Sequence, residues 1–157
     1  MAFSVVCQAL DDCDSVVVRA AMEAAANLRL QTAHERVLSL VTASDESTRL
    51  AALRAAEVLW HSSDFEAVFD RYLHDPSAAV RKQAAWTLHN NVGAEHWERV
   101  FLQWSRDPLP RHRLWACQLA GSFGSRAVVP ALEELRANPD GHVRRAAEQA
   151  LEQIGAG

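Results

Sequence analysis

Three arginines, Arg71, Arg99 and Arg106, offer the clearest recognition chemistry in this 157-residue sequence. A guanidinium group is planar and presents a fixed fork of donors, so it can hold a carboxylate or a phosphate through two parallel hydrogen bonds. An imidazole, His74, and an apolar side chain, Leu102, lie close to them in the sequence. These residue types favour the binding of an acidic group over the making or breaking of covalent bonds.

The residues that could act in catalysis do not occur at the spacings of a known catalytic motif. The sequence has no nucleophile motif, no phosphate-binding glycine loop and no spaced set of metal ligands. Its three cysteines, Cys7, Cys13 and Cys117, form neither a CxxC pair nor an even set for disulfide bonds. We therefore expect no catalytic residue, no metal, no cofactor and a reducing, cytoplasmic location.

The composition indicates a folded, all-α protein. Hydrophobic residues make up 49% of the chain and aromatic residues 7%, while alanine is abundant and glycine is rare. The net charge of -4 argues against a sequence-independent grip on nucleic acid. The start of the chain has no basic leader and no long apolar run follows it, so we expect neither export nor membrane insertion. Arginine far outnumbers the single lysine, Lys82, which indicates a GC-rich bacterial genome.

An internal repeat organises most of the chain. Three segments are similar: DPSAAVRKQAAWTL from Asp75, DPLPRHRLWACQLA from Asp107 and NPDGHVRRAAEQAL from Asn138. Weaker copies lie upstream, and one arginine marks every repeat. This periodic arginine series is Arg19, Arg49, Arg81, Arg113 and Arg144.

Each repeat predicts two helices. An Asp or Asn that can cap free amides is followed by Pro at the expected first helical position, and apolar residues then recur every four positions. The predicted first helices span 14–28, 45–60, 76–90, 108–122 and 139–154. The predicted second helices span 30–42, 63–74, 94–106 and 126–137, after an initial helix at 2–11. No linker interrupts them, so we expect a single domain over 1–157.

The C-terminal segment LAGSFGSRAVVPALEELRANPDGHVRRAAEQALEQIG, from Leu119 to Gly155, resembles the HEAT-like repeats of the phycobilisome-lyase type. In that family a glycine-containing turn precedes an Ala-Val-x-Pro-Ala-Leu helix, then Asp-Pro and Val-Arg-x-x-Ala-Ala. Asn138 departs from the family's Asp. The resemblance implies a right-handed α-solenoid of about five antiparallel two-helix repeats, with a concave groove lined by the second helices.

Helical geometry then selects the residues that face this groove. With about 100° per residue and the apolar stripes turned inward, the opposite side of the second helices carries a sequence of charges. The predicted groove residues are Asp70, Arg71, His74, Arg99, Leu102, Gln103, Arg106, Glu133 and Glu134. The groove is expected to run from a mildly apolar start through an arginine-rich centre to an acidic end. We therefore expect a protein-interaction module whose partner is another protein or an acidic peptide segment.

Enzymes with HEAT-like repeats provide the alternatives. Deoxyhypusine hydroxylases need repeated His-Glu pairs after the Val-Arg motif, and here His34-Glu35 stands alone in a second helix. DNA glycosylases of this type have a strongly basic concave face, which the acidic balance of this chain opposes. A small enzyme subunit similar to a bilin lyase or to a DNA glycosylase remains the alternative to a pure binding module.

Two side chains and one terminal helix leave further alternatives open. Trp86 lies off the apolar stripe of its helix, so it is either an exposed aromatic anchor or a contact to the next repeat. His112 occupies a position that is Val80 and Val143 in other repeats, so it is either a partly satisfied histidine near a helix start or a proton-sensitive contact. The apolar first helix, with Phe3 and Val5, is expected to permit self-association through a terminal repeat.

Overall fold

A computed structural model describes residues 2–155, and within them every regular element is a helix. The predicted all-α fold built from two-helix repeats is therefore confirmed. The described chain divides into two compact units, Met1–Val92 and Gly93–Gly157. The single domain over 1–157 stays a prediction.

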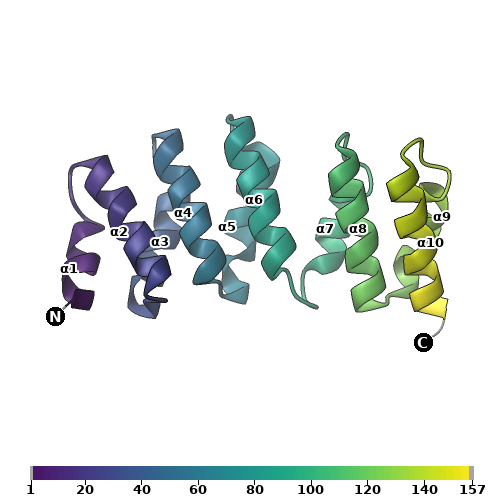
Figure 1. The fold of residues 1–157 in the computed structure, drawn as a ribbon, viewed down its shortest axis with the longest axis horizontal. Coiled ribbons are helices and arrows are strands. Elements are labelled where there is room, and N and C mark those ends of the chain that lie inside the picture. The colour runs from purple at the N-terminus through teal and green to yellow at the C-terminus, as the bar shows by residue number, and fades with distance from the viewer. Residues whose placement is uncertain (1, 156–157) are drawn as a thin grey trace. The chain divides into compact units, whose positions relative to one another are not determined.

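The first unit is built from three helical hairpins in two layers (Figure 1). One layer holds the first helices, which pack side by side: α2 (Ser15–Asn27), α4 (Glu46–Val58) and α6 (Ala78–Asn91). The other layer holds α1 (Ala2–Ala9), α3 (His34–Ser39) and α5 (Phe65–His74). Short 3-10 turns at Gln31–Ala33, Leu40–Thr42 and Ser62–Asp64 complete the second helices.

The second unit contains two hairpins of the same kind. Its first helices are α8 (Pro110–Phe123) and α10 (Gly141–Gly155), which pack against each other. Its second helices are α7 (Trp97–Trp104), which packs on α8, and α9 (Val129–Leu135), which packs on α10. A 3-10 turn at Arg126–Val128 leads into α9.

The apolar stripes predicted from the sequence form the core. Val80, Ala84 and Leu88 of α6 are fully buried, and so are Val100, Phe101 and Trp104 of α7. Burial of one such large side chain stabilises the fold by about 1.5 to 3 kcal/mol. The four-residue spacing predicts that the stripe of α10 runs from Val143 and Ala147 to Leu151. The structure instead buries Ala150 and Ile154 there and leaves Leu151 half exposed.

The starts of the first helices correct one prediction. Pro76, Pro108 and Pro139 precede their helices, which begin at Ala78, Pro110 and Gly141. The preceding Asp or Asn side chain instead accepts a hydrogen bond from the backbone amide two residues ahead: 2.9 Å from Ser77 to Asp75, 2.8 Å from Leu109 to Asp107 and 3.0 Å from Asp140 to Asn138. Such a turn is locally stable for Asp and Asn, and it tolerates the missing proline donor.

The periodic arginine closes the turn before its own helix. In four repeats its Nη1 donates to backbone carbonyls five or six residues earlier. The acceptor carbonyls are those of Ala43 and Ser44 for Arg49, of Asp75 for Arg81, of Asp107 and Pro108 for Arg113, and of Asn138 and Pro139 for Arg144. These contacts measure 2.6 to 3.0 Å. The periodic arginines therefore hold the interhelical turns and are not a row of ligand-binding groups.

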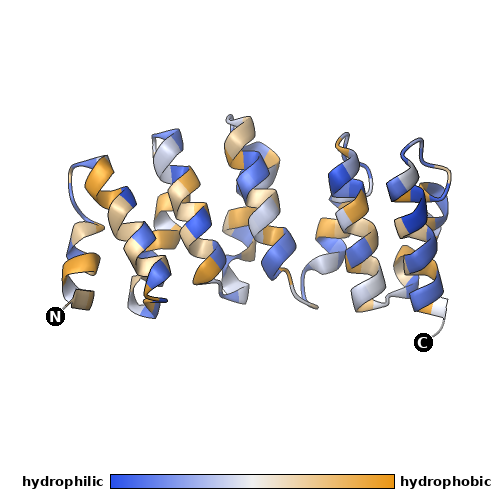
Figure 2. Ribbon diagram, in the orientation of Figure 1, coloured by the Kyte–Doolittle hydropathy of each residue, from blue (hydrophilic) through white to orange (hydrophobic). Residues whose placement is uncertain are grey.

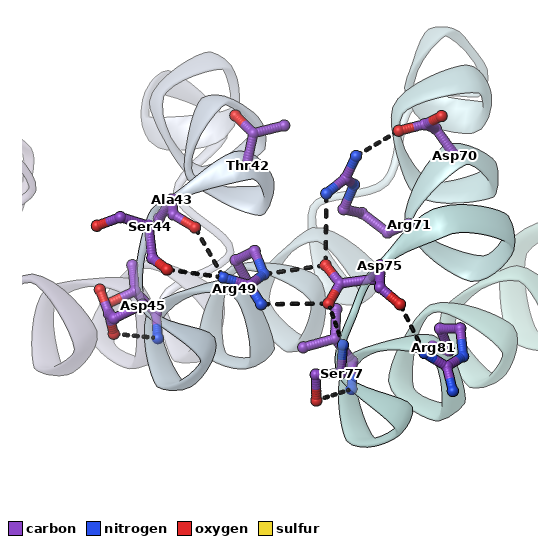
Figure 3. A network of polar contacts seen from close by, with 12 residues as sticks. Thr42, Ala43, Ser44, Asp45, Arg49, Asp70, Arg71, Asp75, Ser77 and Arg81 are labelled. Atoms are coloured by element: carbon purple, nitrogen blue, oxygen red, sulfur yellow. Dashed lines mark hydrogen bonds and ion pairs between the residues drawn. The ribbon is translucent and has the colours of Figure 1, made fainter.

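Arg49 also joins two neighbouring repeats (Figure 3). Its Nε and Nη2 donate to the two oxygens of Asp75 at 2.9 and 3.2 Å, and both side chains are buried. Desolvation acts to raise the pKa of Asp75, but hydrogen bonds from Arg49 and Ser77 and the charges of Arg49 and Arg71 outweigh it. The pKa of this carboxyl group consequently lies below its ordinary value, and Asp75 is held as a carboxylate between two repeats.

Replacing Arg49 tests this inter-repeat pair. We expect Arg49→Met to lower the free energy of unfolding by about 3 to 5 kcal/mol, because it leaves the Asp75 carboxylate buried without its main partner. Arg81→Met is the matched control: it removes only a hydrogen bond to the Asp75 carbonyl, worth about 1 to 2 kcal/mol. Urea denaturation followed by circular dichroism measures both. Equal losses in the two variants would contradict the role given to Arg49.

The Asp75 carboxylate also predicts acid sensitivity. Because its folded pKa is below the ordinary value of 3.8, its contribution to stability is present above that pH and is lost as the pH falls through the folded pKa. We expect Asp75→Asn to be less stable at neutral pH and to lose less stability on acidification than the wild type. Denaturation curves from neutral to strongly acidic pH would show parallel losses if Asp75 were not involved.

Candidate protein-binding surface

Helix α7 presents a charged and apolar side on a rigid base. Arg99, Leu102 and Gln103 of α7 and Arg106, two residues after its end, are all exposed, and Leu102 is 53% exposed. The opposite side of α7 is anchored by its buried aromatic and aliphatic residues, which pack against α8. An exposed leucine flanked by two arginines is suited to an apolar side chain that lies next to an acidic one.

On helix α5 the structure gives one predicted groove residue another role. Asp70 and His74 are exposed, but Arg71 contacts Asp70 and also pairs with Asp75 at 3.4 Å. The guanidinium of Arg71 is thus engaged inside its own unit, where it supports the buried carboxylate of Asp75 (Figure 3). A partner carboxylate would have to compete with these contacts.

Helix α9 carries the predicted acidic residues, Glu133 and Glu134, and both are exposed. Glu133 accepts a hydrogen bond of 2.9 Å from Arg136, and this bond raises the pKa of that arginine. Helix α5 belongs to the first unit, whereas α7 and α9 belong to the second. A continuous groove from Asp70 to Glu134 therefore stays a prediction.

A hollow that was not predicted lies between α2 and α4 in the layer of first helices. Its volume is about 650 Å³, within the range of ligand-binding clefts. Ala20, Leu50 and Ala51 contribute apolar lining, and charged side chains contribute to the rest. The charged residues are Arg19, Glu23 and Arg54. We call this the α2–α4 groove.

A smaller hollow of about 380 Å³ lies at the equivalent place between α8 and α10. Counted from the periodic arginine, the five residues that α4 contributes occupy positions that α10 also contributes, and α10 adds Gln153. The second hollow is polar, however, because Gln118, Gln149 and Gln153 line it. The two units thus share the geometry of this layer and differ in its chemistry.

Small residues in the sequence could have indicated the α2–α4 groove. Ala20 and Ala51 lie one and two positions after the periodic arginines Arg19 and Arg49, on sides that the apolar stripe does not use. Short side chains on adjoining faces leave space that larger ones would fill. The charged second helices carry the stronger sequence pattern, so this groove was not predicted.

Trp86 and His112 have well-defined environments. Trp86 is 45% exposed and stacks on His89, with ring centres 5.7 Å apart. His112 is buried, contacts the Asp107 carboxylate at 2.9 Å and stacks against Trp104 and Trp115. His112 is therefore a buried histidine beside a carboxylate, and a proton-sensitive role for it stays a prediction.

A buried His-Asp pair between α3 and the turn before α5 was missed by sequence reasoning. His34 Nε2 donates to both oxygens of Asp64 at 2.8 Å, and its ring stacks on His61 with centres 3.8 Å apart. Asp64 also accepts a hydrogen bond of 2.9 Å from the backbone amide of His61. His34 and Asp64 are 30 residues apart, one repeat length, so this pair links successive second helices and is not a metal-binding His-Glu pair.

The side chains that could bind a metal or act as a nucleophile are not grouped into a site among the described residues. Among residues 2–155 no three His, Cys, Asp or Glu side chains gather in a way that could hold a metal ion. In the same range no helix combines the length and apolar character needed to span a bilayer. Cys117 is buried in α8, and desolvation raises its pKa to about 12, so its thiol is a poor nucleophile.

Thiol labelling checks this environment. We expect Ellman's reagent to modify the exposed Cys13 rapidly in the native protein, whereas Cys117 reacts only when the second unit unfolds. In a Cys7→Ala background, which removes the half-buried third thiol, Cys117→Ala identifies the slow phase and Cys13→Ala the fast one. Fast modification of Cys117 in the folded wild type would contradict its burial.

Comparisons with known proteins agree with this architecture. A family model described as HEAT repeats matches residues 65–152. No curated protein sequence matches the chain. Three solved structures illustrate the similarity, and all three are below 25% identity, so they show the fold alone.

An engineered protein is 20% identical with a TM-score of 0.63, and the alignment covers 98% of this chain and 79% of that chain. The complex of CpcE and CpcF of phycocyanin lyase from Nostoc sp. PCC7120 is 16% identical with a TM-score of 0.66, covering 100% and 66%. A designed armadillo repeat protein in complex with peptide (KR)4 is 20% identical with a TM-score of 0.66, covering 98% and 82%. Because the family model spans more than half of the chain and the helical hairpins agree with it, this chain belongs to the HEAT-repeat family.

Proposed function

We propose that this protein is a non-enzymatic binding module for a segment of another protein. The observation that carries the proposal is the α2–α4 groove, a hollow of about 650 Å³ with small apolar residues and charged side chains in its lining. Clefts of this volume hold several side chains of a ligand, and a few polar groups then set its orientation. Two of the structural neighbours are themselves complexes, one with peptide (KR)4 and one between CpcE and CpcF.

The lining residues define the chemistry of the segment. Arg54 of α4 is exposed and lines the groove, and its Nε also donates to Gln83 of α6 at 3.4 Å. Glu23 of α2 lies on the other helix of the groove. The complementary segment would place an acidic residue against Arg54 and a basic residue against Glu23. Small apolar side chains between them would pack on the alanines.

The exposed side of α7 remains the second candidate surface for the same function. Arg99, Leu102 and Arg106 there would recognise an acidic segment with one apolar anchor. Because α7 belongs to the other unit, variants on the two surfaces separate the candidates cleanly. No observation on the described residues favours a bilin-lyase or glycosylase reaction over binding.

The experiment begins with affinity capture from the source organism and identification of the partner by mass spectrometry, followed by titration of the purified partner. We expect Ala20→Gln, which fills the α2–α4 groove with a good helix former, to weaken binding at least about tenfold, or roughly 1.4 kcal/mol. Ala127→Gln, at an exposed alanine of the second unit, is the matched control and should bind as the wild type does.

A charge-reversal pair tests the second surface in the same titration. Arg99→Glu with Arg106→Glu is compared with Arg111→Glu with Arg126→Glu, which changes the net charge equally at exposed sites of the same unit. Loss of binding only in the first pair would move the site from the groove to α7. Wild-type affinity in both the groove variant and the α7 variant, with unchanged circular dichroism, would reject both surfaces.

A further inference from the structure

Two pairs of long polar side chains bridge α4 and α6, the neighbouring first helices of the first unit. Arg54 of α4 donates from Nε to the side-chain oxygen of Gln83 at 3.4 Å. Asn90 of α6 donates from its side-chain nitrogen to Glu57 at 2.8 Å. Counted from the periodic arginine of each helix, these bridges join positions 5 and 2, and positions 8 and 9.

The same four positions between α2 and α4 cannot form these bridges. Ala24 and Ala51 stand where Arg54 and Gln83 stand one repeat later, and neither alanine has a polar side chain. Asn27 and Val58 occupy the positions of the second bridge, and Val58 has no polar group to pair with Asn27. The α2–α4 groove is therefore open because both side-chain bridges of the next pair of helices are missing from it.

The lining of the groove combines apolar residues with charges on both walls. Val16 at its start is 61% exposed, and orange and beige segments of α2 and α4 alternate with separate blue ones (Figure 2). Glu23 is exposed on the α2 wall and Arg54 on the α4 wall. The third charged residue, Arg19, already pairs with Asp45 at 3.7 Å. The groove thus offers a carboxylate on one wall and a guanidinium on the other.

The backbone of a bound segment must also find hydrogen-bond partners in this groove. An extended segment leaves its amides and carbonyls to be satisfied by the lining, whereas a helix satisfies its own. Asn27 and Ser47 are the neutral polar side chains that line the groove, too few for the backbone of an extended segment. The residues that α2 contributes run from Val16 to Asn27, about 16 Å along the helix axis, which a helix of about 11 residues would match.

We propose that the segment bound in the α2–α4 groove is an amphipathic α-helix of another protein; this rests on the proposed function, because it specifies the ligand of the same groove. The apolar stripe of that helix packs on Ala20 and Ala51. Its acidic edge lies beside α4 and pairs with Arg54, and its basic edge lies beside α2 and pairs with Glu23. Because reversal of the helix would exchange its two edges, these charges select one of the two directions along the groove.

A displayed library of random 16-residue peptides provides the probe. The library is selected on the full chain and depleted on Ala20→Gln, so that the peptides that remain depend on the groove. We expect them to carry apolar residues at helical spacing, with acidic and basic residues on opposite edges. A synthetic copy of one such peptide should gain helical circular dichroism on binding. Proline in the middle of its exposed side should weaken binding about a hundredfold, because it breaks a helix.

The charge of one wall is tested with the same peptide. We expect Arg54→Glu to weaken its binding about tenfold, because an attraction becomes a repulsion. A second peptide, with lysine in place of the acidic residues of that edge, should bind Arg54→Glu better than it binds the wild type. Arg111→Glu, an equal change of charge at an exposed site of the second unit, is the control and should bind both peptides as the wild type does.

Three outcomes would overturn the helical ligand: a selection that yields no peptide dependent on Ala20, selected peptides that tolerate the proline and gain no helicity, or an Arg54→Glu variant that binds the first peptide like the wild type. Circular dichroism shows that each variant is folded. The titration of the natural partner with Ala20→Gln remains the test of the proposed function. If that titration succeeds and the selected peptides are extended, the function stands and the helical ligand is wrong; if the partner binds Ala20→Gln normally, the groove is wrong as its site.

Discussion

The buried pair of Arg49 and Asp75 is the contact on which the geometry of the first unit depends. A single guanidinium holds the carboxylate of the next repeat and the two carbonyls of its own turn. Because each of these polar groups would be costly to bury alone, the two hairpins can pack closely only in the arrangement that satisfies all of them. The apolar stripes supply the driving force, and this pair selects the register.

Because arginines donate to the backbone carbonyls of the turns, fewer of them can bind a partner. Arg49, Arg81, Arg113 and Arg144 direct their guanidinium groups at carbonyls before their own helices, and Arg71 is turned toward Asp75. An inventory of arginines in the sequence therefore overstates the positive charge that is available to a partner. The arginines left for recognition are those outside the repeat pattern, such as Arg54 and Arg106, which are exposed.

Sequence reasoning succeeded where the repeat carries the information. The first helices and their buried stripes could be placed because Val80, Ala84 and Leu88 recur at helical spacing and an arginine marks each copy. The starts of the three first helices that follow Asp-Pro or Asn-Pro were placed two residues early, because this dipeptide was interpreted as a cap with proline in the first turn. The Asp or Asn side chain instead accepts a hydrogen bond from the amide after the proline. The pairing of His34 with Asp64 could not be derived from composition, since it depends on how adjacent second helices meet.

The α2–α4 groove could not be predicted for a related reason, and this suggests how one repeat fold acquires different surfaces. Its volume comes from alanines that are neutral in the helix and in the core, so no charge or motif marks them. At the equivalent place in the second unit Leu114 stands where α2 has Ala20, and Arg145 and Gln149 stand where α4 has Leu50 and Arg54. The hollow there is smaller and polar. Substitution at a few positions off the buried stripe changes the ligand chemistry of a repeat and leaves its packing unaltered. Selection for binding can therefore act on these positions independently of selection for the fold.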